Sequence, residues 1–112
     1  MRVSFVVLML LALCLVASAQ QVMPRMSTVE PGNGKVGDVL TATGENLAKD
    51  QVEKLYLTDG KNDVQVQITE QTATAIKFKI PVKATPGRFS LMLLTSGKEP
   101  KLIEQPVKVQ VE

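Results

Sequence analysis

The side chains of this sequence that could do chemistry are few, and most are carboxylates. The chain has no histidine, and its single cysteine, Cys14, lies in the apolar N-terminal segment. A Ser-His-Asp triad is therefore excluded, together with the commonest metal ligand of proteins. Asp59 and Asp63 flank one short turn, and paired carboxylates of this kind can cleave glycosidic bonds. A solvated hairpin loop explains the same two residues, so we predict no catalysis and no cofactor.

Calcium and carbohydrate sites are the next candidates. Oxygen donors in predicted loops are Asp38, Glu45, Asp59 and Asp63. Calcium requires about six to eight oxygens converging on one point, whereas these carboxylates are interspersed with lysines and show no Asp-x-Asp-x-Asp spacing. A stacking platform for sugars needs exposed aromatic rings, and the chain has no tryptophan and one tyrosine, Tyr56. The sequence therefore favours neither a metal site nor a sugar site built on stacking.

Residues 1–19 have the three parts of a secretory signal peptide. Arg2 precedes an apolar run over residues 3–16, and Ala17-Ser18-Ala19 forms a small-residue cleavage site. A run of 14 residues is shorter than the roughly 20 that a membrane-spanning helix needs. We predict cleavage after Ala19 and a secreted or periplasmic protein without a membrane span.

Lipid attachment at Cys14 is the competing interpretation of the same segment. Attachment would require a small residue directly before the cysteine, where the sequence has the bulky Leu13. It would also shorten the apolar region and leave the Ala-x-Ala site unused. The signal-peptide interpretation therefore accounts for more of the segment.

Residues 20–112 have the size and composition of one secreted domain. They carry 12 basic and 11 acidic side chains, since only Arg2 is lost with the signal peptide. Nucleic-acid binding needs a concentrated basic surface, so this balance argues against it. Without a cysteine the domain must be held by its hydrophobic core, and the absence of a disulfide between sheets favours a bacterial source.

Strand patterns recur along this domain. Apolar residues alternate with polar ones in segments bounded by turn residues, and these segments are 26–29, 39–43, 54–58, 64–68, 76–80, 89–93 and 107–111. About seven antiparallel strands predict an all-β, immunoglobulin-like β-sandwich of the early set. Only residues 47–54 could form a helical turn. The predicted core includes Leu55, Leu57, Val66, Ile76, Phe78, Phe89 and Leu91.

Turn residues separate the predicted strands. Asp59-Gly60 suits a turn that needs positive φ, and Asn33-Gly34 predicts the sharpest bend after the first strand. The six prolines are predicted at strand ends, edges or turns, where no central hydrogen bond is lost. Lys77, Lys79 and Lys83 form a small basic stripe. A solvated strand face that blocks aggregation explains this stripe without an anionic partner.

Several of these turn and packing residues follow a recognisable order. Pro31-Gly32, Gly37-Asp38, Leu40-Thr41-Ala42 and Gly44 succeed one another, and residues 76–93 contain a strand ending in proline and a Pro-Gly turn into an apolar strand. In this order they resemble the IPT/TIG domain, an immunoglobulin-like fold shared by plexins, certain transcription factors and many bacterial surface proteins. The resemblance spans about residues 23–111. For bacterial members it implies adhesion, carbohydrate-associated or structural roles.

A partner surface is predicted from alternation along two strands. If Leu91 and Leu55 point inwards, then Ser90, Met92 and Leu94 point outwards, as do Tyr56 and Thr58. The two strands are neighbours in an immunoglobulin-like topology. The predicted partner surface therefore consists of Tyr56, Met92 and Leu94. The alternative is that residues 95–106 fold over it, with Leu102 or Ile103 as a lid.

These observations together predict a non-catalytic IPT/TIG-like module that is secreted into the bacterial cell envelope. It would act on a protein or envelope partner through a sheet face or a strand edge. The alternative is a small secreted carbohydrate-active enzyme, or a carbohydrate-binding module, that uses loop carboxylates.

Overall fold

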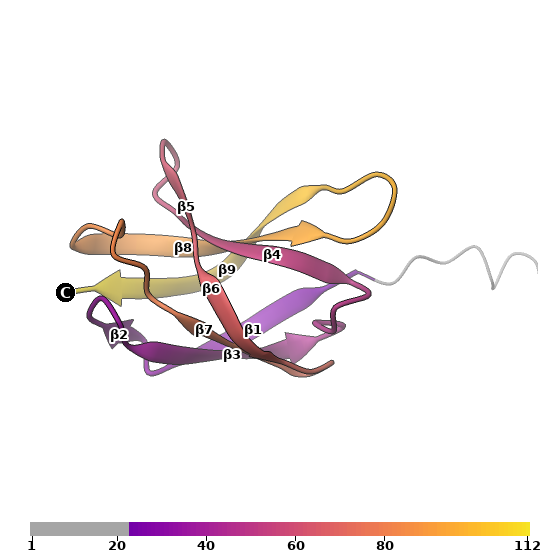
Figure 1. Ribbon diagram of the computed structural model, residues 1–112, viewed down its shortest axis with the longest axis horizontal. Coiled ribbons are helices and arrows are strands. Elements are labelled where there is room, and N and C mark those ends of the chain that lie inside the picture. The colour runs from indigo at the N-terminus through magenta and orange to yellow at the C-terminus, as the bar shows by residue number, and fades with distance from the viewer. Residues whose placement is uncertain (1–22) are drawn as a thin grey trace, which may run out of the picture.

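Two packed β-sheets make up the protein, as the computed structural model of residues 23–112 shows (Figure 1). The first sheet has the order β1-β3-β7-β6, from β1 (Arg25–Glu30), β3 (Val39–Glu45), β7 (Ala75–Lys79) and β6 (Gln67–Gln71). The second has the order β2-β9-β8-β4-β5, from β2 (Asn33–Gly34), β9 (Leu102–Val111), β8 (Gly87–Thr95), β4 (Val52–Thr58) and β5 (Asp63–Gln65). The predicted all-β sandwich is confirmed, while the predicted cleavage site and Cys14 lie outside the described residues.

The described residues form nine strands, where the sequence predicts about seven antiparallel ones. One addition is β2, which pairs in parallel with the end of β9. The other arises because the predicted strand 64–68 divides at Val66. The Val66 amide donates to the Leu55 carbonyl of β4 at 3.0 Å, and the next residue, Gln67, already pairs with Lys79 of β7 in the other sheet. Val66 is therefore where the chain crosses between sheets.

The sharp bend predicted at Asn33-Gly34 is wrong, because these two residues form β2. Positive φ occurs instead at Gly37, where φ is 95°. Gly34 serves close packing, since a Cβ there would lie 3.1 Å from Ile80 Cδ1 and 3.2 Å from Leu40 Cδ2. The possible helical turn within residues 47–54 is present as a single turn, because the amides of Gln51 and Val52 both donate to the Ala48 carbonyl at 2.9 Å. It leads directly into β4 at Val52.

The core lies between the two sheets and contains every residue that the sequence assigned to it. Successive side chains of a strand point to opposite faces, so every second residue points towards the other sheet. The predicted residues that are buried are Leu55, Leu57, Val66, Ile76, Phe78, Phe89 and Leu91. Leu47 fills one end of the core, following Asn46, whose φ of 59° turns the chain back over the sandwich.

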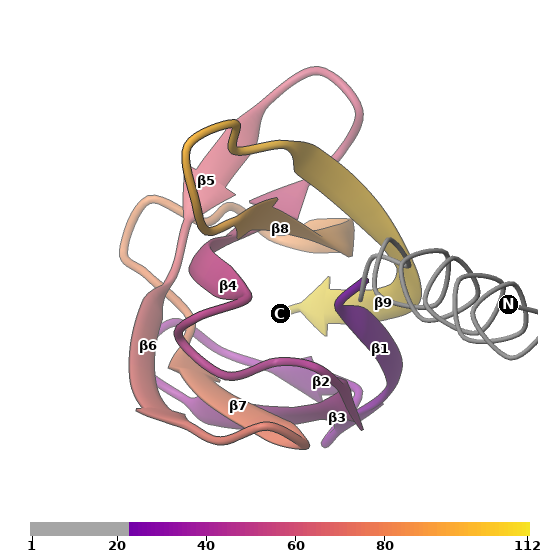
Figure 2. The same ribbon diagram turned by 90° about the vertical axis from the view of Figure 1, so that its right-hand side faces the viewer.

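Glutamine side chains join the two sheets at their sides. On one side β1 lies beside β9 (Figure 2), and the Met26 amide donates to Gln105 Oε1 at 2.7 Å. At the end of β6, Gln71 Nε2 donates to the carbonyls of Leu47 and Val52 at 2.8 and 2.9 Å. Amide side chains thus form hydrogen bonds with main-chain groups that do not pair within either sheet.

Candidate functional site

The outer face of the second sheet brings the predicted partner residues together. Tyr56 lies directly opposite Met92 across β4 and β8, and Leu94 lies opposite Lys54 in the same pair of strands. The side chains of Tyr56, Met92 and Leu94 are all half-buried. Directly opposed residues of an antiparallel pair have Cβ atoms about 5 Å apart. The predicted adjacency of these strands is therefore confirmed.

Leu102 and Ile103 do not fold over this face, so the alternative of a lid is wrong. From Leu102 onward the chain is strand β9, which pairs edge to edge with β8 and places Leu102 opposite Leu94 and Ile103 opposite Leu93. Leu102 is 55% exposed. Leu102 therefore extends this partly exposed apolar surface. We name it the outer apolar row, and it consists of Tyr56, Met92, Leu94 and Leu102.

Ser90 and Thr58 are predicted to be exposed on this face, and the structure corrects that prediction. They oppose each other across β8 and β4 but are only 6% and 4% exposed. Lys108 Nζ donates to Ser90 Oγ at 2.6 Å, and the Gly60 amide donates to Thr58 Oγ1 at 3.1 Å. Both side chains are short, so a neighbouring lysine and the turn after β4 are sufficient to cover them.

A hollow of about 270 Å³ lies at this point of the outer face, next to the outer apolar row. It lies where the end of β4 and the start of β8 meet β9. We name it the polar hollow, and its polar lining residues are Thr58, Asp59, Arg88, Ser90, Glu104 and Lys108.

Asp59 holds the turn between β4 and β5. Its Oδ1 accepts hydrogen bonds from the amides of Asn62 at 2.7 Å and Lys61 at 2.9 Å. These bonds lower the pKa of the Asp59 carboxyl below its ordinary value of 3.8, because they favour the charged form. Gly60 has the predicted positive φ, at 94°. Asp63 lies on the other arm of the turn, opposite Thr58. Asp59 thus holds a hairpin turn and Asp63 begins the exposed strand after it, as the simpler interpretation expects.

The fold, the turn glycines and the packing positions agree with one domain family. The IPT/TIG domain family matches residues 24–111. The chain belongs to this family. The match covers nearly all of the described residues, which form the two-sheet sandwich that the resemblance implies.

Several solved structures with the same fold come from Bacteroides proteins. A Bacteroides thetaiotaomicron protein of unknown function has a TM-score of 0.68 at 17% identity, covering 82% of this chain and 22% of its own. An auxiliary nutrient binding protein from Bacteroides ovatus has a TM-score of 0.59 at 16% identity, covering 82% and 21%. SGBP-B of the Bacteroides ovatus mixed-linkage glucan utilization locus, in complex with a mixed-linkage heptasaccharide, has a TM-score of 0.51 at 22% identity, covering 77% and 23%.

At these identities the likeness shows the fold, and the IPT/TIG chain spans about a fifth of the length of each of those proteins. No curated protein matches the sequence. None of the segments that the structure describes forms a helix long and apolar enough to cross a membrane.

The loop carboxylates of the domain do not gather into a metal site. Within residues 23–112, no three His, Cys, Asp or Glu side chains lie close enough to hold a metal ion together. Asp38 was a candidate oxygen ligand for calcium. Its Oδ2 accepts a hydrogen bond from the Lys35 amide at 2.9 Å and so holds its own loop. In the basic stripe, Lys77 pairs with Glu70 at 3.1 Å, which partly neutralises that face.

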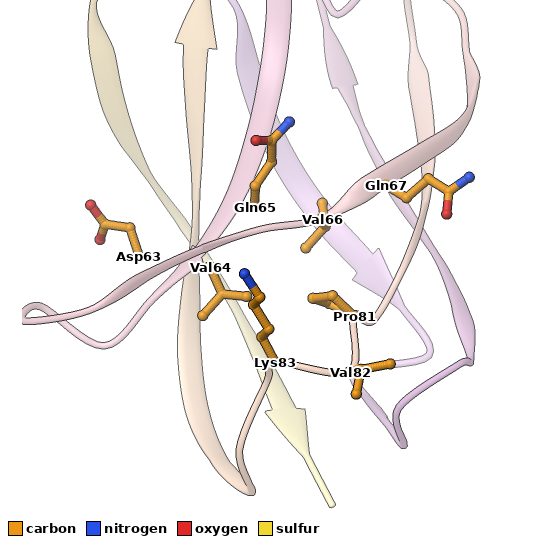
Figure 3. A pocket seen from close by; sticks show the side chains of 8 residues that line it. All are labelled: Asp63, Val64, Gln65, Val66, Gln67, Pro81, Val82 and Lys83. Atoms are coloured by element: carbon orange, nitrogen blue, oxygen red, sulfur yellow. The ribbon is translucent and has the colours of Figure 1, made fainter.

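A second hollow, of about 640 Å³, lies where the chain crosses between the sheets (Figure 3). Val64 and Val66 line it from the β5–β6 crossing, and Pro81 and Val82 line it from the loop after β7. Val82 is 87% exposed. Lys83 of the basic stripe also lines this hollow, from the loop after β7. The hollow lies beside β5, an edge strand of its sheet.

Proposed function

We propose that this chain is a secreted, non-catalytic binding module of the bacterial cell envelope that contacts a protein partner through the outer apolar row. The observation that carries the proposal is the direct opposition of Tyr56 and Met92 on an uncovered sheet face, flanked by Leu94 and Leu102. Tyrosine and methionine are enriched in protein interfaces. A contiguous exposed apolar surface on a small domain marks a contact site more often than isolated apolar residues do.

The state of Asp59 supports a role without catalysis. A general acid for glycoside cleavage needs a raised pKa so that it carries a proton near neutral pH. The turn amides lower the pKa of Asp59 and hold it as an anion. This carboxyl group is therefore unsuited to donate a proton to a leaving group.

Export is supported by the sequence of residues 1–19, with its basic start, apolar run and small-residue cleavage site. A bacterial envelope is consistent with the three Bacteroides structures described above, one of which is an auxiliary nutrient binding protein.

Carbohydrate binding without catalysis is the second candidate function, and one feature of the chain favours it. The polar hollow adjoins the row that contains Tyr56, the only tyrosine of the chain. The likeness to SGBP-B, which was solved with a heptasaccharide, points in the same direction.

Site-specific photo-crosslinking tests the protein contact. A photoreactive residue placed at Met92 should form adducts with one envelope protein in intact cells. The matched control carries the same group at Val82, which is more exposed but lies on the loop after β7. Equal adducts from both positions, or none from position 92, would contradict a partner on the outer apolar row.

A further inference from the structure

The polar hollow lies beside an irregularity in the pairing of β8 with β9. Ser90 and Met92 of β8 are two residues apart, yet their partners on β9, Lys108 and Glu104, are four residues apart. The two extra residues make β9 bulge, and bulges re-aim side chains and recur beside binding sites. Lys108 and Glu104 lie on either side of this bulge along β9, and both line the hollow.

The floor of the polar hollow offers two hydroxyl protons. A hydroxyl group has one donor proton and two acceptor lone pairs. Thr58 Oγ1 accepts from the Gly60 amide, and Ser90 Oγ accepts from Lys108 Nζ. In the part of the chain that the structure describes, neither hydroxyl donates a hydrogen bond. A ligand oxygen in the hollow could therefore accept from both.

The walls add two cations. Arg88 lies opposite Gln110 and Ser90 lies opposite Lys108, so Arg88 and Lys108 are diagonal neighbours on one face. Among residues 23–112 the one ion pair joins Lys77 to Glu70, so neither cation of the hollow is in a direct ion pair. Two like charges at this spacing repel each other, and an anion bound between them would relieve that repulsion.

Carboxylates also line the polar hollow, and they restrict which chemical groups a ligand can carry. Glu104 and Asp59 line the hollow as acceptors, and Asp59 keeps its charge because the turn amides stabilise it. A simple anion would meet repulsion from both carboxylates, whereas ligand hydroxyls would donate to them. A neutral sugar would leave the cations without a partner. The complementary ligand therefore carries one carboxylate and several hydroxyls on a compact frame.

We propose that the polar hollow binds a hexuronic acid residue of an acidic saccharide, with its carboxylate towards Arg88 and Lys108 and its ring hydroxyls towards Glu104 and Asp59. This inference rests on the second candidate function, carbohydrate binding, and is independent of the protein contact. The hollow, at about 270 Å³, is slightly smaller than the roughly 300–1,000 Å³ of sites for drug-sized ligands. One sugar ring is therefore the unit that it accommodates.

Titration of the purified protein followed by amide NMR tests the proposal with three probes. Galacturonate supplies carboxylate and hydroxyls, galactose supplies hydroxyls alone, and glutarate supplies carboxylates alone. We expect galacturonate to shift the amide signals of Thr58, Ser90 and Lys108 saturably. Galactose and glutarate should each bind at least about tenfold more weakly, the size of effect that losing one charge-assisted hydrogen bond produces.

Variants locate the site within the face. Arg88→Gln should weaken galacturonate binding about tenfold or more, while Arg25→Gln on the exposed surface of β1 should leave it unchanged. Urea unfolding of each variant checks that the fold is intact. If Arg88→Gln is destabilised, Lys108→Gln replaces it as the test, with the same expected loss.

Each contrary result has a distinct meaning. If glutarate binds as well as galacturonate, the hollow takes any carboxylate, including an acidic side chain of a peptide, and the saccharide proposal is overturned. If galactose binds equally, the uronic acid assignment fails while carbohydrate binding stands. If none of the three probes binds, or if Arg88→Gln and Lys108→Gln bind galacturonate like the unaltered protein, the polar hollow is not a sugar site. Absence of all binding would also remove the support for the second candidate function.

Discussion

At the scale of single residues, alternation along β8 decides which side chains stabilise the fold. Phe89 points into the core and is 5% exposed. Phe89→Ala should lower the free energy of unfolding by about 3–5 kcal/mol, because it removes buried surface and leaves a cavity. Urea denaturation measures this loss, with Val82→Ala as an exposed control that should change it by less than about 0.5 kcal/mol. A loss below about 1 kcal/mol for Phe89→Ala would mean that the side chain is not part of the core.

Asp59 predicts a pH dependence of stability. Its pKa is lowered in the folded protein by the amides of Asn62 and Lys61. The stabilisation is therefore fully present above the unfolded pKa, near 3.8, and is lost as the pH falls through the lower folded pKa. At pH 7 the unaltered protein should have a higher free energy of unfolding than Asp59→Asn. The two free energies should converge once the pH lies below the pKa of Asp59 in the folded protein. Unfolding curves measured from pH 7 to pH 2 check this, and a constant difference would show that the charge of Asp59 has no part in it.

Sequence patterns predicted which face of the sheet a side chain lies on better than they predicted how far it is buried. Alternation placed Thr58 and Ser90 on the outer face correctly, but their burial depends on Lys108 and on the turn at Gly60. Lys108 lies 18 residues from Ser90 along the chain, and no local pattern reports such a contact. For the same reason the polar hollow was missed, although the charged residues around it were visible in the sequence.

At the scale of elements, the pairing of β1 with β3 depends on one glycine. Gly44 lies opposite Met26, and a Cβ on Gly44 would lie 1.9 Å from the Arg25 carbonyl oxygen. Because that obstacle is backbone, Gly44→Ala should force the strands apart and cost at least about 1–3 kcal/mol, as overpacking does. Thermal or urea unfolding tests this. Gly32→Ala is the matched control, since a Cβ there meets nothing within 4 Å.

The contact between β1 and β9 depends on Gln105, a buried polar residue. Its Oε1 accepts from the Met26 amide, so Gln105→Ala would leave a buried donor unpaired. We expect a loss of about 1–3 kcal/mol in the free energy of unfolding. Amide hydrogen exchange should also become faster at Met26. Gln110→Ala, an exposed change on the same strand, should alter neither, and equal effects of the two variants would contradict this role.

The elements themselves were predictable to different degrees. Strands with strict alternation and clear turns were found, because one buried face leaves a period of two in the sequence. The same pattern does not record which sheet a strand joins, so the crossing at Val66 was invisible. The start of β9 was also missed. Pro106 was predicted at a strand end but lies within β9. Proline has no amide N–H to donate, and none is required there because the pairing of β9 with β8 is interrupted by the bulge opposite Leu91.

At the scale of the whole molecule, the sandwich presents a broad sheet face that its own chain leaves open. Glutamine contacts and the crossing strand connect the two sheets at the sides (Figure 2), so the outer face of the second sheet is free to carry function. Family membership follows from glycines and packing positions spread along the chain. The identity of a partner depends on the chemistry of one face, which the fold does not specify.

Met92→Lys tests the central claim, that the outer apolar row is an open contact surface, most directly. Met92 is half-buried and points away from the core, so this change should alter the free energy of unfolding by less than about 0.5 kcal/mol. The same variant should no longer capture the envelope protein that is crosslinked at this position. Val82→Lys, a charge added to an exposed apolar residue elsewhere, should retain capture. A loss of several kcal/mol in Met92→Lys would show that the row is part of the folded interior, and unchanged capture would show that the partner binds elsewhere.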